Sequence, residues 1–310
     1  MLRAVLHDLR AWGRFPVVTT LDRRLRGTSL PADRVVVLDT EVYPTGLADL
    51  AKLCGAALLI APESEGILER VSALVRDAGA CLLGSRPEGV AVAADKWECY
   101  QRFVRAGLPT PETVCTTPAG AVQTAEELGF PLVVKPVTGA GCDGVAFVPR
   151  VHLLQTALQL PALRHAEHLL LQRFVAGTPA SVSLLVAGKD SLALSLNEQW
   201  VQAGIPFTYR GGVACTSRHR SAQAFQLAKR AVALVPGLQG YVGVDLVLGH
   251  QGCRLLEINP RLTTSYVGLH RVININLAEA IWRACREGAL PECVSAAGEA
   301  AFGKEELGGL

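Results

Sequence analysis

The chain has 310 residues, half of them hydrophobic, and its 30 Lys and Arg nearly balance its 28 Asp and Glu, for a formal net charge of +2. This length allows two or three packed units with a large apolar core. The balanced charge and the lack of a Lys/Arg block argue against nucleic acid as a partner. No apolar run approaches the roughly 20 residues that cross a bilayer, and no secretion signal follows Met1, which argues against a membrane role.

The nine cysteines are an odd number and form no Cys-x-x-Cys pair. This pattern is typical of reduced thiols in a cytoplasmic protein, and a disulfide framework or a zinc site fits it less well. His165 and His168 have helical spacing, but no further ligand accompanies them, so we interpret both as surface residues.

Residues 1–92 alternate short apolar runs with helical stretches. The pattern predicts helices at residues 1–12, 47–53 and 66–78 and strands at residues 16–19, 34–38, 57–60 and 81–84. Such alternation indicates an α/β unit with an open, Rossmann-like parallel sheet covered by helices. A unit of this kind usually begins with a strand, so we expect one to precede Met1.

Two further units are expected, at residues 93–168 and 169–310. In the first, the sequence predicts helices at 95–106 and 152–160, strands at 129–136 and 145–148, and a tight polar loop at 138–144. In the second, it predicts a strand at 169–175, a strand-rich region at 177–198, a glycine-rich linker at 209–212 and helices at 222–234 and 275–287.

A hairpin at residues 243–261 carries the most informative polar residues. A three-residue turn at 250–252, with Gly252 in the left-handed position, pairs Gly249 with Cys253 and Asp245 with Glu257. Strand alternation then places three polar side chains on one face: Asp245, Glu257 and Asn259. The other face is apolar: Val244, Leu246, Leu248, Leu256 and Ile258. Two carboxylates and an amide suit Mg²⁺ (or Mn²⁺), often completed by nucleotide phosphates; the alternative is a solvated face with a chance pair of acids.

Residues 139–144 match G-x-G-x-x-G, but an apparent strand follows them. The match is therefore a hairpin tip and not a dinucleotide-binding turn, and no Gly-Lys-Ser/Thr makes it a Walker A loop. Glycine-rich hairpins can cover phosphates, although an ordinary flexible turn is the alternative. Lys135 precedes the loop, which is the reverse of the protein-kinase order, and its apolar strand leaves it in need of an anion. Lys96, at a helix start, is explained by a bound phosphate or by simple exposure.

In chain order these parts resemble the ATP-grasp family of carboxylate–amine ligases. The resemblance rests on residues 95–96, 130–136, 138–145, 171–177, 243–245 and 257–261. Residues 1–8, 17–22, 195–199, 209–212 and 259–266 are most similar to the branch that contains the tyramine–glutamate ligases of methanofuran biosynthesis. The pyrrolysine-pathway ligase belongs to the same broad branch. The implied fold is two α+β lobes that sandwich ATP, preceded by the sheet domain.

The resemblance also implies a role for each matching residue. Lys96 and Lys135 would hold the ATP phosphates under a loop that Gly139, Gly141 and Gly144 allow to close. The backbone of Arg173, Phe174 and Val175 would bind adenine beside Gln172, and Asp245, Glu257 and Asn259 would hold the metal. Arg261 would steady the γ-phosphate or an acyl phosphate, which makes it, with Lys135, a catalytic residue. Where relatives often carry an acid for the ribose, this chain has Ala180, so we expect ribose recognition to differ.

The implied reaction activates a carboxylate as an acyl phosphate, which an amine then attacks, so the expected partners are small-molecule carboxylates and amines. Arg210, Arg218 and Arg220 are candidates for anion binding, with surface charge as the alternative. Thr264, Ser265 and Tyr266 are candidates for the acceptor pocket or for capping the next helix. Another ATP-grasp enzyme, pyrrolysine-pathway-like or carboxylase-type, and a degenerate ATP-binding protein remain alternative functions. A homodimer also remains open.

Overall fold

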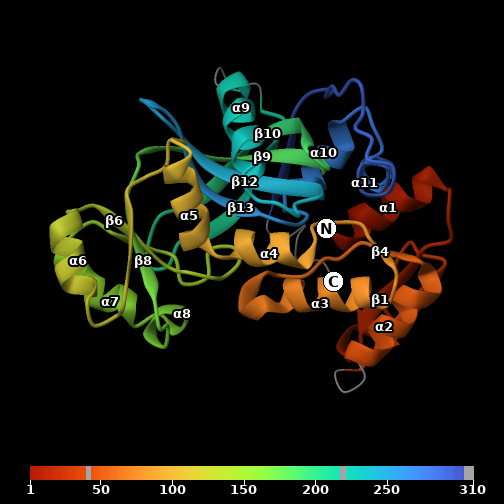
Figure 1. The fold of residues 1–310 in the computed structure, drawn as a ribbon, viewed down its shortest axis with the longest axis horizontal. Helices are drawn as coiled ribbons and strands as arrows, with labels where there is room; N and C mark the ends of the chain where they lie inside the picture. Colours follow the sequence, from red (N-terminus) through yellow and green to blue (C-terminus); the bar gives the residue numbers. More distant parts are fainter. Residues whose placement is uncertain (40–42, 217–220, 304–310) are drawn as a thin grey trace.

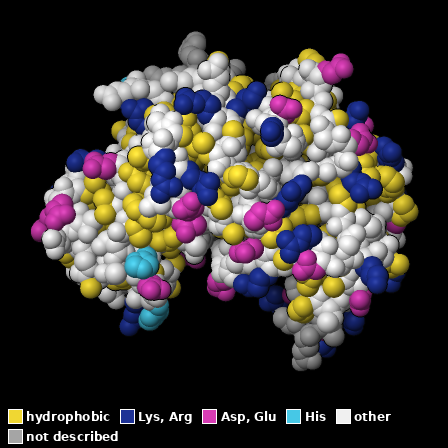
Figure 2. All heavy atoms as spheres, in the orientation of Figure 1, with side chains coloured by type: hydrophobic (Ala, Val, Ile, Leu, Met, Phe, Trp, Pro, Cys, Tyr) yellow, Lys and Arg dark blue, Asp and Glu magenta, His cyan; other side chains and the backbone are white. Residues whose placement is uncertain are grey.

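The computed structural model describes residues 1–39, 43–216 and 221–303 and arranges their elements in three groups (Figure 1). An N-terminal α/β group lies at one end of the molecule and a small lobe at the other, with a large antiparallel sheet between them. Lys, Arg, Asp and Glu are interspersed over the face shown in Figure 2. None of the described helices is long and apolar enough to cross a membrane.

The N-terminal group contains two pairs of parallel strands. β1 (Val18–Asp22) pairs with β2 (Arg34–Leu38), and β3 (Ala56–Ala57) pairs with β4 (Cys81–Leu82). The parallel pairing is as expected, but β3 and β4 are shorter than predicted because residues 58–60 leave the ladder. The helices are α1 (Leu2–Trp12), α2 (Tyr43–Cys54), α3 (Ile67–Asp77) and α4 (Pro87–Ala94), with 3₁₀ turns at Arg23–Leu25 and Ser64–Gly66. The sequence reading did not include α4.

The small lobe is a four-stranded antiparallel sheet in the order β5-β8-β6-β7. Its strands are β5 (Thr113–Thr116), β6 (Leu132–Pro136), β7 (Ala146–Val148) and β8 (Leu169–Arg173). Its helical segments are α6 (Ala121–Leu128), a 3₁₀ turn at Val151–Leu153, α7 (Leu154–Leu158) and α8 (Pro161–Arg164). Because β8 pairs with β5 and β6, we propose that this lobe extends beyond residue 168, through β8.

The large lobe is a six-stranded antiparallel sheet in the order β13-β12-β9-β10-β11-β14. Its strands are β9 (Gly177–Ala187), β10 (Asp190–Gln202), β11 (Thr208–Ala214), β12 (Gly240–Gly249), β13 (Gly252–Asn259) and β14 (Ala300–Gly303). α5 (Lys96–Arg105) and α9 (Ser221–Val232) pack on one face. α1, α10 (Tyr266–Val272) and α11 (Leu277–Arg286) pack on the other. Successive residues of β9 serve the two cores, with Leu184 facing α9 and Leu185 facing α11.

The prediction of a glycine-rich linker at residues 209–212 is wrong, because these residues lie within β11. A Cβ on Gly211 would approach Phe302 O to 2.2 Å, and one on Gly212 would approach Glu198 O to 2.2 Å. The glycines therefore permit close approach of neighbouring strands in a sheet, which is a second use of glycine that a sequence pattern does not separate from a flexible linker.

The predicted pairing of Asp245 with Glu257 is confirmed, although the predicted turn is wrong. Gly249 pairs with Gly252, so the turn contains two residues instead of three. A β-bulge between Asp245 and Leu246 restores the register by adding one residue to β13. The bulge also makes the predicted apolar face wrong at one position. Leu255 is buried in the core, whereas Leu256, which was predicted to face the core, is only half-buried.

Candidate active site

Lys96 connects the glycine loop to the acidic hairpin. It is the first residue of α5, whose N-cap is Asp95; the Asp95 carboxylate accepts a hydrogen bond of 2.9 Å from Glu98 N. Lys96 Nζ donates to Gly139 O at 2.7 Å and lies 3.7 Å from Glu257 Oε2. The side chain is buried, so the alternative of simple exposure does not hold.

Lys135 lies on β6 with no carboxylate within ion-pair distance among the described residues. Its Nζ donates to Gln172 Oε1 at 3.1 Å, and Gln172 Nε2 donates in turn to Thr113 Oγ1 at 2.8 Å. Burial lowers the pKa of Lys135 to about 8, against a smaller opposing effect of the Glu257 charge. The buried ammonium therefore lacks a close anion that would compensate its desolvation.

In the acidic hairpin it is negative charge that is buried without full compensation. Asp245 Oδ1 accepts a hydrogen bond from Gln199 Nε2 and Asp245 Oδ2 accepts one from Asn259 Nδ2, both at 3.1 Å. Burial, and then the charge of Glu257, raise the pKa of Asp245 to about 7. A buried carboxylate that resists ionisation, with a second carboxylate and an amide beside it, fits the oxygen ligands that a hard divalent cation requires.

The glycine loop between β6 and β7 has left-handed backbone at two of the predicted positions. Gly141 has a φ of 65° and Gly144 a φ of 68°, while Gly139 has a φ of 142°. A Cβ on Gly144 would lie 2.7 Å from Ala162 Cβ, whereas one on Gly141 would meet nothing within 4 Å. Gly144 is thus held against α8, and Gly141 lies in open space.

The segment predicted to bind adenine follows β8. Phe174 N donates to Pro131 O at 3.1 Å, and its ring lies 4.6 Å from that of Phe147. The exposed Arg173 side chain donates to Glu112 Oε2 at 2.9 Å. Val175 is half-buried. Ala180, the position at which the resemblance implies an acid for the ribose in relatives, is fully buried in the core that contains α9.

Arg261 forms a bidentate ion pair with Glu63. The guanidinium donates from Nε to Glu63 Oε2, and from Nη2 to Glu63 Oε1 at 3.1 Å. Beside this pair, a small cavity lies between the N-terminal group and the large lobe. Its lining includes Leu58, Leu83, Tyr241, Arg261 and Leu262. The sequence predicted no role for Glu63, although it lies shortly after a strand of an α/β unit, where ligand-binding residues gather.

Gln199 is a second residue to which the sequence assigned no role. It lies on β10 and its amide contacts the Asp245 carboxylate. Gln199 and the buried Asn197 are two residues apart on that strand, so strand periodicity places both polar side chains on one face, and this pattern can be recognised in the sequence. Asn197 Nδ2 donates to Ser183 Oγ at 3.0 Å, which connects β10 to a cluster of buried hydroxyl groups formed by Ser183, Tyr241 and Ser265.

The proposed substrate residues separate in the structure. Tyr209 and Thr264 share a hydrogen bond of 2.8 Å between hydroxyl groups, and burial raises the pKa of Tyr209 to about 12. Ser265 lies in the buried hydroxyl cluster, 3.2 Å from Ser183 Oγ. Arg210 is exposed and bonds to Gln202 Oε1 at 2.7 Å. Arg218 and Arg220 lie outside the described residues.

Tyr266 does not join this group. It is fully buried and donates to Asp8 Oδ2 at 2.6 Å, on the sheet face covered by α1 and α10. The expectation that Tyr266 lines an acceptor pocket with Thr264 is corrected, because α10 begins at Tyr266 and directs it toward the N-terminal helix.

Comparison with known families agrees with this arrangement. Residues 93–265 match the ATP-grasp domain and residues 15–90 match the pre ATP-grasp 3 domain. The chain belongs to the ATP-grasp family. Members of this family use ATP and a divalent metal.

One curated relative of this ATP-grasp chain is the tyramine–L-glutamate ligase of Methanocaldococcus jannaschii. It is 30% identical over 228 residues, which are 73% of this chain and 61% of the relative. The chain therefore spans about three fifths of the length of that relative.

Solved structures show the same fold. Biotin carboxylase from Campylobacter jejuni superposes with a TM-score of 0.81 at 15% identity, covering 96% of this chain and 71% of that one. L-Amino acid ligase from Bacillus licheniformis gives a TM-score of 0.73 at 18% identity, covering 94% and 74%. At such identities the likeness concerns the ATP-grasp fold alone.

Proposed function

We propose that the protein is an ATP-dependent, ADP-forming ligase that joins a carboxylate to an amine. The observation that carries this proposal is that one site contains both a buried positive charge and buried carboxylates, each without full compensation. Lys135 is buried with no close anion among the described residues and its pKa is lowered, while Asp245 is buried beside Glu257 and its pKa is raised. A complex of ATP with a divalent metal supplies phosphate charge for the lysine and a cation for the acids.

In this proposal Lys96 and Lys135 hold the ATP phosphates, and the glycine loop covers them with backbone N–H groups. Asp245, Glu257 and Asn259 hold Mg²⁺ or Mn²⁺, which when bound neutralises phosphate charge. The backbone at residues 173–175 binds adenine, with Gln172 beside it. The contact of Lys96 with both Gly139 O and Glu257 supports a single site shared by the loop and the hairpin.

The donor carboxylate attacks the γ-phosphorus of ATP, ADP leaves, and an acyl phosphate forms. The amine then attacks the acyl carbon and inorganic phosphate leaves, which produces an amide. Arg261 neutralises the transferred phosphoryl group, and Glu63 orients Arg261 through the bidentate pair. The protein contributes positioning and charge neutralisation, without a covalent nucleophile.

For the substrates, we propose L-glutamate and tyramine, in a methanofuran-type cofactor pathway. Support comes from the relative with 30% identity that carries this name. The hydroxyl pair of Tyr209 and Thr264 is a candidate contact for the amine acceptor. We place the protein in the cytoplasm, where its nine free cysteines stay reduced; assembly as a homodimer stays an expectation.

The test is ADP release with Mg²⁺-ATP across a matrix of carboxylate donors and amine acceptors. L-Glutamate with tyramine is the first combination, and mass spectrometry identifies the product. A condensed product that requires both substrates supports the ligase, and its mass names them. ADP release that depends on bicarbonate favours a carboxylase-type enzyme. ATP binding without turnover in any combination favours the degenerate binder.

A further inference from the structure

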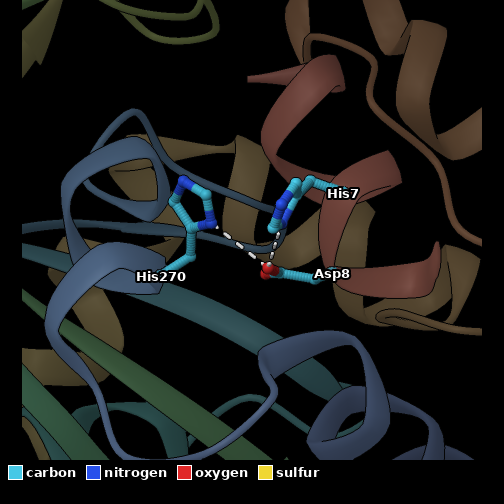
Figure 3. A group of neighbouring side chains, drawn as sticks. All are labelled: His7, Asp8 and His270. Carbon is cyan, nitrogen blue, oxygen red and sulfur yellow. Dashed lines mark hydrogen bonds and ion pairs between the residues drawn. The ribbon is translucent and has the colours of Figure 1, made fainter. Parts of the chain in front are cut away.

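Outside the proposed active site, two imidazoles and a buried carboxylate meet where the N-terminal helix packs on the large lobe. His7 and Asp8 lie on α1 and His270 lies near the end of α10 (Figure 3). Each of the three residues offers one ligand atom, and these atoms all lie within 4.8 Å of one another. Figure 3 shows both imidazoles directed at the Asp8 carboxylate.

The distances in this cluster suit a small transition-metal ion. Asp8 Oδ1 lies 3.1 Å from His270 Nδ1 and 3.8 Å from His7 Nδ1. Ligand bonds of about 2.0–2.2 Å in a tetrahedral zinc site place neighbouring ligand atoms about 3.3 Å apart. These two separations lie on either side of that value, and all three ligand atoms lie within 4.8 Å of one another, so a tetrahedral site requires the exposed His7 side chain to move inward.

The charge of the buried Asp8 carboxylate is an independent reason to expect a metal ion at this cluster. The side chain is only 10% exposed, and among the described residues the two imidazoles are the only basic groups within 4 Å of its carboxylate. An imidazole compensates that charge only when it is protonated, and burying a carboxylate without a cation is costly. A divalent ion coordinated by neutral imidazoles would supply that charge.

The surroundings of Asp8 also resemble the support of a metal ligand. Tyr266 Oη donates to Asp8 Oδ2 at 2.6 Å, which leaves Oδ1 directed at the imidazoles. Asn276 Nδ2 donates to the Asp8 backbone carbonyl at 2.8 Å and anchors this turn of α1. Hydrogen bonds of this kind fix the orientation of ligating carboxylates in metal sites.

We propose that His7, Asp8 and His270 form a zinc site that is separate from the proposed ATP site and fastens α1 to α10. Imidazole ligands favour Zn²⁺ over Mg²⁺, and three protein ligands leave one position for water on the exposed His7 side. The ligands on α1 and α10 are more than 260 residues apart in the chain. A bound ion therefore restrains the N-terminal helix against the large lobe.

The test uses tag-free protein, cleared of metal, and compares wild type with His7→Ala, His270→Ala and the control His168→Ala. His7 is 73% exposed, so we expect its loss to leave the fold intact, and His168 is an exposed histidine of the small lobe. We expect one Zn²⁺ per wild-type chain by calorimetry, and binding weaker by at least about tenfold in either ligand variant but not in the control. At about 100 times Kd, Zn²⁺ should raise the Tm of wild type by about 4 °C.

A second readout separates this site from the cysteines, since exposed Cys54 and Cys293 can bind Zn²⁺ independently. Co²⁺ bound at the histidine site should show ligand-field absorption without a thiolate charge-transfer band, and the absorption should be lost in His7→Ala. Equal Zn²⁺ affinity in wild type and both ligand variants would overturn the proposal. So would Co²⁺ spectra that show only thiolate ligation.

Discussion

Glu63 and Arg261 lie 198 residues apart and form a buried bidentate ion pair between the N-terminal group and the large lobe. Glu63 follows the short strand β3, and Arg261 follows the hairpin strand that carries Glu257 and Asn259. The pair therefore connects the cavity at the N-terminal group with the proposed phosphate site. Both side chains are mostly buried, and among the described residues neither forms another ion pair.

Glu63→Gln is expected to lower kcat by about 10- to 100-fold, because Arg261 loses the partner that orients it. Removing one member of a buried pair should also cost about 3 kcal/mol of unfolding free energy. Steady-state ADP release and urea denaturation measure the two effects. The exposed Glu65, two residues on, provides the control: Glu65→Gln should resemble wild type. An unchanged kcat in Glu63→Gln would remove the positioning role.

Asp245→Asn is expected to abolish the response of activity to Mg²⁺ and to reduce kcat by at least about 100-fold, because a charged ligand is lost. The asparagine oxygen can still accept the hydrogen bond from Gln199, so the fold should persist. Turnover as a function of Mg²⁺ concentration tests this. Asp190→Asn, at the exposed start of β10, is the control. An Mg²⁺ response equal to wild type would contradict the ligand assignment.

ATP binding is expected to take up protons above about pH 8, because burial holds the pKa of Lys135 near that value in the free protein. Phosphate stabilises the ammonium form and raises this pKa, so affinity should fall as pH rises beyond 8. The stability of the free protein depends on pH in the opposite direction from ATP affinity. The unfolded chain keeps the Lys135 proton to higher pH, so this group makes the free energy of unfolding rise between about pH 8 and 10.5.

Calorimetry at pH 8.5 in two buffers with different ionisation enthalpies measures the proton uptake. Lys135→Met should remove it, and Lys189→Met, in the exposed turn between β9 and β10, should not. The same uptake in Lys135→Met and wild type would show that another group carries the proton.

Gly144→Ala is expected to destabilise the protein more than Gly141→Ala. Both positions have left-handed backbone, which costs a residue with a Cβ about 1 kcal/mol. At Gly144 the new Cβ also meets Ala162 Cβ at 2.7 Å, so we expect a total of about 3 kcal/mol. Urea denaturation of the two variants provides the comparison. Equal losses would mean that the contact with α8 yields without cost.

Much of the site follows from local sequence. The apolar alternation of the hairpin specifies which residues face the core, and this was enough to pair Asp245 with Glu257. The position of Lys135 beside a glycine loop indicated phosphate chemistry, and the structure places its ammonium in a buried polar chain with Gln172. Residues close in sequence share one strand or one turn, so their relative placement is set by periods of two and 3.6 residues.

The amino-acid sequence alone predicts the type of most elements, the acidic hairpin and the ATP-grasp resemblance. Three features depend on how the elements pack: residues 209–212 form a strand, a bulge and not a longer turn sets the hairpin register, and Tyr266 turns to Asp8. The tertiary structure also brings Glu63 to Arg261 and His7 to His270. These contacts join residues some 200 or more positions apart, and no local periodicity encodes such pairing, because it depends on how separately formed faces pack together.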